Sequence, residues 1–279
     1  MTQESFASDQ PFRPLALGFF IEENNESTDT KPIVQGSDWQ RIYAINLLCR
    51  QGDFSKTHHV APILMRNTES LIWSAGVNII ASASRWEDVQ KALNVFQERI
   101  DTPWVRYNMS LLLGLSCDLR AVDPLLMIYG RCTDPEEDGD QTLRELSYLL
   151  EAANKEIFGG GGAEIEHQRI VNLAAPLRDA LSHSVQGTKV FESETFDVVR
   201  LATRLLAQAE NGNLQSERFY RGRLIFEANT GVNCSSFFNE LGRPDRLSIM
   251  AILEEFFDGN PREKYKPGQR YFFGHPILP

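Results

Sequence analysis

The sequence predicts an all-α fold. Apolar residues recur at helical spacing along most of the chain, and residues that favour helix starts precede several of these stretches. A Val-x-x-x-Leu spacing returns at 60–64, 89–93 and 122–126, in steps of 29 and 33 residues (60 to 89 and 89 to 122). Steps of this length are typical of stacked helical repeats. We therefore expect short helix pairs that share one apolar core.

The first expected helices follow a lead-in, residues 1–36, which is polar except for an apolar patch at 11–21. We expect that patch to pack onto the domain. Ser37 or Asp38 can cap the first helix, because short polar side chains accept hydrogen bonds from exposed amides at a helix start. Gly52 ends it. The four helices expected in this part of the chain cover 37–52, 60–65, 68–82 and 86–100.

Residues 103–126 carry the most specific pattern. Pro103 stands in the first turn of an expected helix, which continues as VRYNMSLLLG and is followed by LSCDLRAVDPLL. This stretch resembles the HEAT repeat family, and Asn108 departs from the family pattern. The resemblance covers 37–158 and implies antiparallel helix pairs stacked as a short solenoid, with Arg106 and Asp118 in polar contacts between repeats. It implies no activity. The residues that match are Val105, Arg106, Leu113, Gly114, Asp118, Ala121, Val122, Leu125 and Leu126.

The C-terminal half, 163–279, begins after four glycines, Gly159–Gly162, which predict a hinge because glycine is costly inside a helix. The final segment, KYKPGQRYFFGHPILP, is irregular, since its prolines and glycines exclude regular helix. Its aromatic residues require burial, so we expect this tail to cap the end of the solenoid. Helices are expected at 166–183, 193–210, 216–228, 235–241 and 245–257.

Charge and composition narrow the class of partner. The net charge is −10, from 38 acidic and 28 basic residues. This balance disfavours nucleic acid and anionic membranes and favours a protein partner with a basic face. No signal-like segment and no apolar run of about 18 residues occurs, so we expect no membrane insertion. The four cysteines form no CxxC pair, which favours a reduced, cytoplasmic protein.

An acidic loop at 134–145, DPEEDGDQTLRE, is the strongest motif for a ligand. Asp134, Glu136, Asp138 and Glu145 stand at positions one, three, five and twelve of a loop similar to an EF-hand calcium site. Glu136 and the proline before it depart from that pattern, so we prefer a solvated turn between repeats. Calcium remains the weaker alternative, and we expect no cofactor. The tentative partner-binding residues in this loop are Asp134, Glu136, Glu137, Asp138 and Asp140.

An arginine-aromatic stretch in the second half is the other candidate site. Arg218, Tyr220, Arg221 and Arg223 lie within six residues. This composition is typical of a protein-binding hot spot and equally of a buried ion-pair network with Glu227. We favour the network, and we keep these four residues as tentative partner-binding residues.

No catalytic motif emerges. The chain lacks a GxSxG elbow and a Ser-x-x-Lys motif, and His58-His59 is interpreted as a surface pair because no third metal ligand stands at suitable spacing. A reactive thiol at Cys234 is a weaker alternative, since no basic residue adjoins it. The sequence thus predicts a non-enzymatic protein.

The leading functional hypothesis is a protein-binding protein. More specifically, we expect a bacterial immunity protein that neutralises a toxin by direct binding. Two alternatives remain open. One is a scaffold or adaptor of a larger bacterial assembly. The other is a calcium-regulated module or small enzyme that uses the acidic loop at 134–145.

Overall fold

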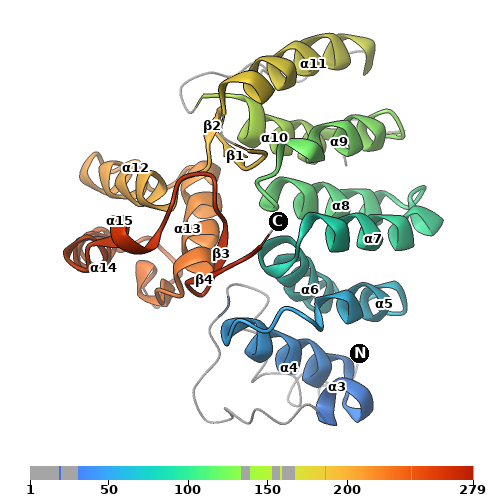
Figure 1. Ribbon diagram of the computed structural model, residues 1–279, viewed down its shortest axis with the longest axis horizontal. Coiled ribbons are helices and arrows are strands. Elements are labelled where there is room, and N and C mark those ends of the chain that lie inside the picture. Colours follow the sequence, from blue (N-terminus) through green and yellow to red (C-terminus); the bar gives the residue numbers. More distant parts are fainter. Residues whose placement is uncertain are drawn as a thin grey trace.

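The computed structural model describes residues 19, 31–132, 139–152, 158, 167–185, 187–239 and 241–278. Helices dominate this part of the chain, as predicted, and its four strands have two residues each (Figure 1). Up to residue 184 the helices are α3 (Lys31–Gln35), α4 (Asp38–Arg50), α5 (Val60–Met65), α6 (Ser70–Ala83), α7 (Trp86–Phe96), α8 (Pro103–Leu115), α9 (Val122–Tyr129), α10 (Asp140–Leu150) and α11 (His167–Ser184). Short 3₁₀ turns η3 (Thr57–His59), η4 (Gln97–Arg99) and η5 (Leu119–Ala121) join them.

These helices lie one above the other in a single column (Figure 1). Helices α4, α6, α8 and α10 contact one another in succession and form what we call the inner row. Helices α5 and α7 contact each other on the other side, and with α9 they form the outer row. Helices α4 to α11 bury apolar residues against their neighbours, because a short helix gains most of its stability from such packing.

Local sequence explains several helix boundaries. Ser37 caps α4: its hydroxyl accepts the amide of Gln40, and the Gln40 side chain accepts the amide of Ser37 at 2.9 Å. Pro103 occupies the first turn of α8, where its missing N–H costs nothing. These boundaries follow the sequence predictions to within a few residues.

Two predicted helices are wrong in part. The helix expected from Ser193 begins only at Val198, because residues before it form a hairpin of β1 (Val190–Phe191) and β2 (Glu194–Thr195). Asp197 caps the helix by accepting the amides of Val199 and Arg200. The helix expected at 235–241 is only the 3₁₀ turn η7 (Ser235–Phe237), followed by an antiparallel bridge between Phe238 and Pro244.

Four further helices form what we call the C-terminal unit: α12 (Val198–Glu210), α13 (Glu217–Thr230), α14 (Arg246–Asp258) and α15 (Pro261–Lys264). Helix α12 packs on both α13 and α14, and α13 also contacts α6. The unit therefore stands beside the helix column, with α13 nearest to the inner row (Figure 1).

The aromatic tail forms a second hairpin, β3 (Tyr271–Phe272) and β4 (His275–Pro276). We expected it at the end of the helix column, but β3 contacts α13 and α6 and thus lies between the C-terminal unit and the inner row. Phe272 is fully buried, with its ring centroid 5.2 Å from that of Phe19. Phe19 belongs to the apolar patch of the lead-in, which was expected to pack on the domain. The aromatic side chains are buried as predicted, at a different place.

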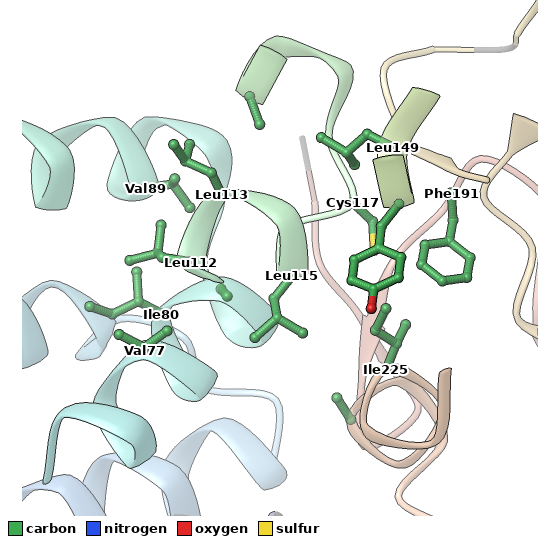
Figure 2. Packing of buried hydrophobic residues seen from close by; sticks show 14 of the residues in the cluster. Val77, Ile80, Val89, Leu112, Leu113, Leu115, Cys117, Leu149, Phe191 and Ile225 are labelled. Atoms are coloured by element: carbon green, nitrogen blue, oxygen red, sulfur yellow. The ribbon is translucent and has the colours of Figure 1, made fainter. Parts of the chain in front are cut away.

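One hydrophobic core links the column to the C-terminal unit (Figure 2). Leu112 and Leu113 of α8 pack between α6 and α7, whereas Leu115 and Cys117 extend the core toward Phe191 and Ile225 (Figure 2). The C-terminal unit and the column are therefore parts of one packed structure. Among the described helices, none combines the length and the apolar composition that crossing a membrane requires.

Candidate functional site

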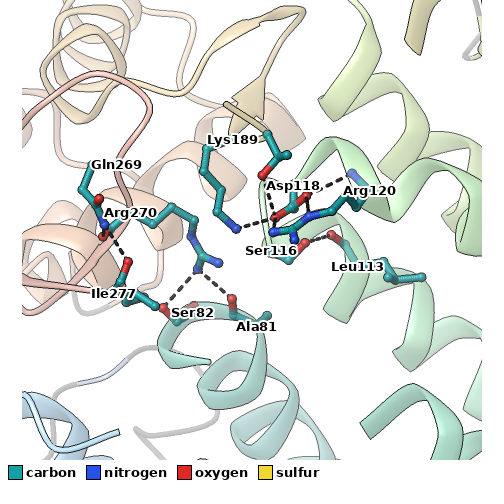
Figure 3. Close-up of polar contacts among 11 residues, drawn as sticks. Ala81, Ser82, Leu113, Ser116, Asp118, Arg120, Lys189, Gln269, Arg270 and Ile277 are labelled. Atoms are coloured by element: carbon teal, nitrogen blue, oxygen red, sulfur yellow. Dashed lines mark hydrogen bonds and ion pairs between the residues drawn. The ribbon is translucent and has the colours of Figure 1, made fainter. Parts of the chain in front are cut away.

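A buried polar junction joins the helix column to the C-terminal half (Figure 3). At its centre is Asp118, whose side chain is fully buried. Arg120 donates to both carboxylate oxygens, at 2.9 and 2.8 Å, and Thr188 and Lys189 donate to the second oxygen. These donors hold the pKa of Asp118 below its usual value, although burial acts in the opposite direction. A charged Asp118 thus ties the α8–α9 turn to Thr188 and Lys189, the residues directly before β1.

Arg270 makes the second long-range contact of this junction. Its Nη2 donates to the carbonyl oxygens of Ala81 and Ser82, at 2.6 and 3.0 Å (Figure 3). These carbonyls belong to the last turn of α6, where the helix dipole attracts a cation. Because Arg270 is only 3% exposed, it fastens the tail to the inner row from inside the protein.

The arginines of α13 point into ion pairs with other elements. Arg218 pairs with Glu151 and Glu192, and Arg221 pairs with Glu145 of α10. Their side chains are 20% and 9% exposed, so most of each guanidinium is unavailable to a partner. This geometry agrees with the ion-pair interpretation of the arginine stretch.

Arg223 also belongs to this network. It pairs with Glu227, one helical turn along α13, at 2.9 Å. The predicted ion-pair network included this glutamate. The other oxygen of Glu227 accepts the backbone amide of Phe19 at 2.7 Å. The arginine stretch thus fixes α13 to α10, to the β1–β2 turn and to the lead-in.

Only part of the acidic loop at 134–145 lies within the described residues. Asp134, Glu136, Glu137 and Asp138 lie outside the described residues, and Asp140 is exposed at the first position of α10. Glu145, the twelfth position of the calcium-like pattern, is buried inside α10 and bonded to Gln141 and Arg221. Burial raises the pKa of Glu145 to about 7. Within the described residues Glu145 serves the ion-pair network, and no group of three potential metal ligands occurs there.

Tyr220 is the member of the arginine stretch that faces solvent, at 37% exposure. Its ring stacks on Phe238, with centroids 5.5 Å apart and planes 10° apart. The segment that follows Phe238 leaves Leu241 and Leu247 largely exposed, at 79% and 77%. Tyr220, Leu241 and Leu247 are thus the accessible apolar side chains of this part of the C-terminal unit.

A groove of about 510 Å³, which we call the α14 groove, opens between α14, the end of α13 and the α15 turn. Its apolar wall comes from Val232, Ile252, Phe256, Pro261 and Tyr265. The Phe256 ring packs edge-on against Phe226 at 5.0 Å, and the Tyr265 ring packs edge-on against Tyr271 at 5.0 Å. Such aromatic contacts make the wall a fixed part of the core.

One acidic residue of α14, Glu255, lines the α14 groove, and two more stand close to it in the sequence. Glu254, Glu255 and Asp258 are exposed within the last five residues of α14, and that last turn has no basic residue. None of the three forms an ion pair with a described residue. The negative end of the helix dipole makes these positions unfavourable for carboxylates. On the other side, Lys264 also lines the groove and is held over the Tyr265 ring.

The sequence pattern contains only a weak indication of this groove. The segment ILEEFFD of α14 combines apolar and acidic residues, but only the fold shows which of them share a wall with Val232 and Tyr265. The predicted partner-binding residues and the α14 groove have no member in common.

Candidate catalytic groups are not brought together in the described residues. Cys234 is fully buried, and burial raises its pKa well above the usual value, so its thiol does not suit a nucleophile. The rings of His58 and His59 lie 4.1 Å apart on the surface. Comparison with protein-family models, with curated proteins and with solved structures found no match to the chain.

Proposed function

We propose that this chain is a non-enzymatic protein-binding protein and that its partner inserts a basic, partly apolar segment into the α14 groove. The observation that carries the proposal is the combination of an apolar wall, the carboxylate of Glu255 beside it, and two further exposed carboxylates, Glu254 and Asp258, at the same end of α14. An apolar anchor beside complementary charge is typical of protein interfaces. A basic partner would neutralise Glu254, Glu255 and Asp258 and remove their unfavourable interaction with the α14 dipole.

The helix column is proposed to be a HEAT-like solenoid. The ordered contacts of α4, α6, α8 and α10 support this, as does the regular spacing of the Val-x-x-x-Leu segments. Helix α13 and strand β3 lie against the inner row, so the chain covers part of that row with its own residues. This arrangement favours a binding surface on the C-terminal unit.

Neutralisation of a basic toxin by direct binding is the biological role we propose. The net charge of −10 favours association with a strongly basic protein, and the exposed acidic end of α14 supplies a local contact for it. In this role the chain blocks its partner by occupying a surface and performs no chemistry.

The test is co-expression of the tagged chain with the products of the genes that flank its own gene. We expect one product to co-purify and the complex to weaken as NaCl rises from about 0.05 to 0.5 M, because salt screens surface charges. The double variant Glu254→Lys/Glu255→Lys should lower affinity about tenfold or more, since each reversal removes an attraction and adds a repulsion.

A matched variant separates local contact from net charge. Glu87→Lys/Glu98→Lys changes the charge equally, at exposed positions on the outer-row side. We expect this variant to bind within about threefold of the original chain, since the effect of distant charges is screened. Equal loss in both variants would refute the α14 groove as the binding site, and failure of every product to bind would remove the proposed role.

A further inference from the structure

The polar junction holds more positive than negative charge. Asp118 is the carboxylate that Arg120 and Lys189 share, and Arg270 has no carboxylate within ion-pair distance among the described residues. Three cations thus surround one acid in a region where Asp118 and Arg270 are almost completely shielded from water. Arg120 is 40% exposed and therefore hydrated, so the buried excess is that of Arg270, for which the end of α6 supplies only about half a negative charge. An uncompensated buried charge is costly, so an anion is favoured there.

Arg270 has unused hydrogen-bond donors at this place. Its Nη2 is occupied by the two carbonyl groups of α6, whereas Nε is buried and has no hydrogen-bond partner in the described part of the chain. The Nη1 group likewise makes no hydrogen bond to a described residue. A guanidinium normally uses most of its five N–H groups when it is buried. The remaining donors of Arg270 therefore require an acceptor.

Lys189 lies next to these donors. Figure 3 shows the Lys189 amino group bonded to Asp118 and, beside it in this view, the Arg270 guanidinium bonded to the end of α6. Burial lowers the pKa of Lys189, and repulsion from Arg270 lowers it further, which agrees with their proximity. One N–H of Lys189 is taken by Asp118, so two remain. The side chain is 19% exposed, and a small ligand can therefore reach it from solvent.

We propose that a small inorganic anion binds between the amino group of Lys189 and the guanidinium of Arg270. The anion accepts N–H groups from both residues and balances the charge that Asp118 leaves uncompensated. It would connect three segments: the residues directly before β1, at Lys189, the aromatic tail around Arg270 and, through Arg270, the end of α6. This site is distinct from the α14 groove and does not depend on the proposed partner.

The test is thermal unfolding and calorimetric titration of the full chain with sodium phosphate and, separately, sodium chloride, at constant ionic strength set by a bulky organic sulfonate. We expect a saturable rise in Tm with at least one of the two anions, because a ligand of the folded state stabilises it. Lys189→Gln should raise the dissociation constant about tenfold or more. Glutamine still donates to Asp118, so the fold contact is retained.

Two further variants complete the design. Lys91→Gln removes an equal charge at an exposed position of α7, outside both proposed sites, and should leave anion affinity within about twofold. Arg270→Lys keeps the charge but offers fewer N–H donors, so it should weaken anion binding. This variant takes the place of Lys189→Gln if the latter does not fold. No saturable response to either anion would overturn the proposal, and so would equal weakening by Lys189→Gln and Lys91→Gln.

Discussion

Substitution of Gly114 by alanine tests the packing of α8 against α10. A Cβ at this position would lie 2.6 Å from Cδ and 2.9 Å from Cβ of Glu145, with a carboxylate oxygen nearer still. Glu145 is fully buried and paired with Arg221, so it has no open space into which to move. We therefore expect Gly114→Ala to force the buried carboxylate away from its partner.

The magnitude follows from three opposing contributions. Alanine improves helix propensity by about 1 kcal/mol. Overpacking costs about 1–3 kcal/mol, and loss of a buried ion pair costs up to about 3–5 kcal/mol. Because the pair is weakened and not removed, we expect a net loss of about 2–4 kcal/mol in the free energy of unfolding. At about 2 °C per kcal/mol, Tm should fall by about 4–8 °C.

Urea denaturation followed by circular dichroism measures this loss. The comparison variant is Gly222→Ala in α13, where the nearest atoms are leucine side-chain carbons at 3.2 and 3.3 Å, which we expect to change stability by less than about 1 kcal/mol. In a Glu145→Ala background, Gly114→Ala should cost at least about 1 kcal/mol less than in the original chain. Additive effects of the two substitutions, or a stabilising Gly114→Ala, would refute the close approach of Glu145.

Two further predictions concern the buried carboxylates. Burial raises the pKa of Glu145 to about 7, so between about pH 4.5 and 7 the folded chain keeps a proton that the unfolded chain loses. The free energy of unfolding should therefore fall as pH rises through this range, by up to about 1.4 kcal/mol per pH unit. Urea denaturation of Glu145→Gln across this pH range should show no such fall in the free energy of unfolding. If the variant and the original chain had parallel pH profiles, the raised pKa of Glu145 would be contradicted. Asp118→Asn should cost about 3–5 kcal/mol at pH 7, because its cations lose their carboxylate. The pKa of Asp118 is depressed, so this cost should shrink as pH falls below about 3.8; a cost independent of pH would argue against the ion pair.

Local signals predicted the helices well because their causes lie within a few residues. The capping box at Ser37 and the proline at the start of α8 fix helix starts through neighbouring backbone groups. The hairpin at 190–195 has another cause: the amide of Glu192 donates to the carbonyl of Tyr148 in α10. A contact between distant segments leaves no periodic pattern in the sequence. The predicted start of the following helix therefore lies too early in the chain.

The candidate site was likewise predictable only where its contacts are local in the sequence. Composition indicated that the α13 arginines form ion pairs, but their partners Glu145 and Glu192 come from other elements and have no fixed spacing from them. Arg270 bonds to Ala81 across 189 positions, which no local pattern predicts. The α14 groove likewise exists only when α14, the end of α13 and the α15 turn are packed together.

Hydrogen-exchange mass spectrometry of the chain, alone and with the flanking-gene product that co-purifies, locates the partner-binding surface. Binding at the α14 groove predicts slower exchange of backbone amides across residues 252–265, with the outer-row helices α5, α7 and α9 unchanged. If protection were confined to the outer row and exchange across 252–265 were unchanged, the partner would not bind at the α14 groove.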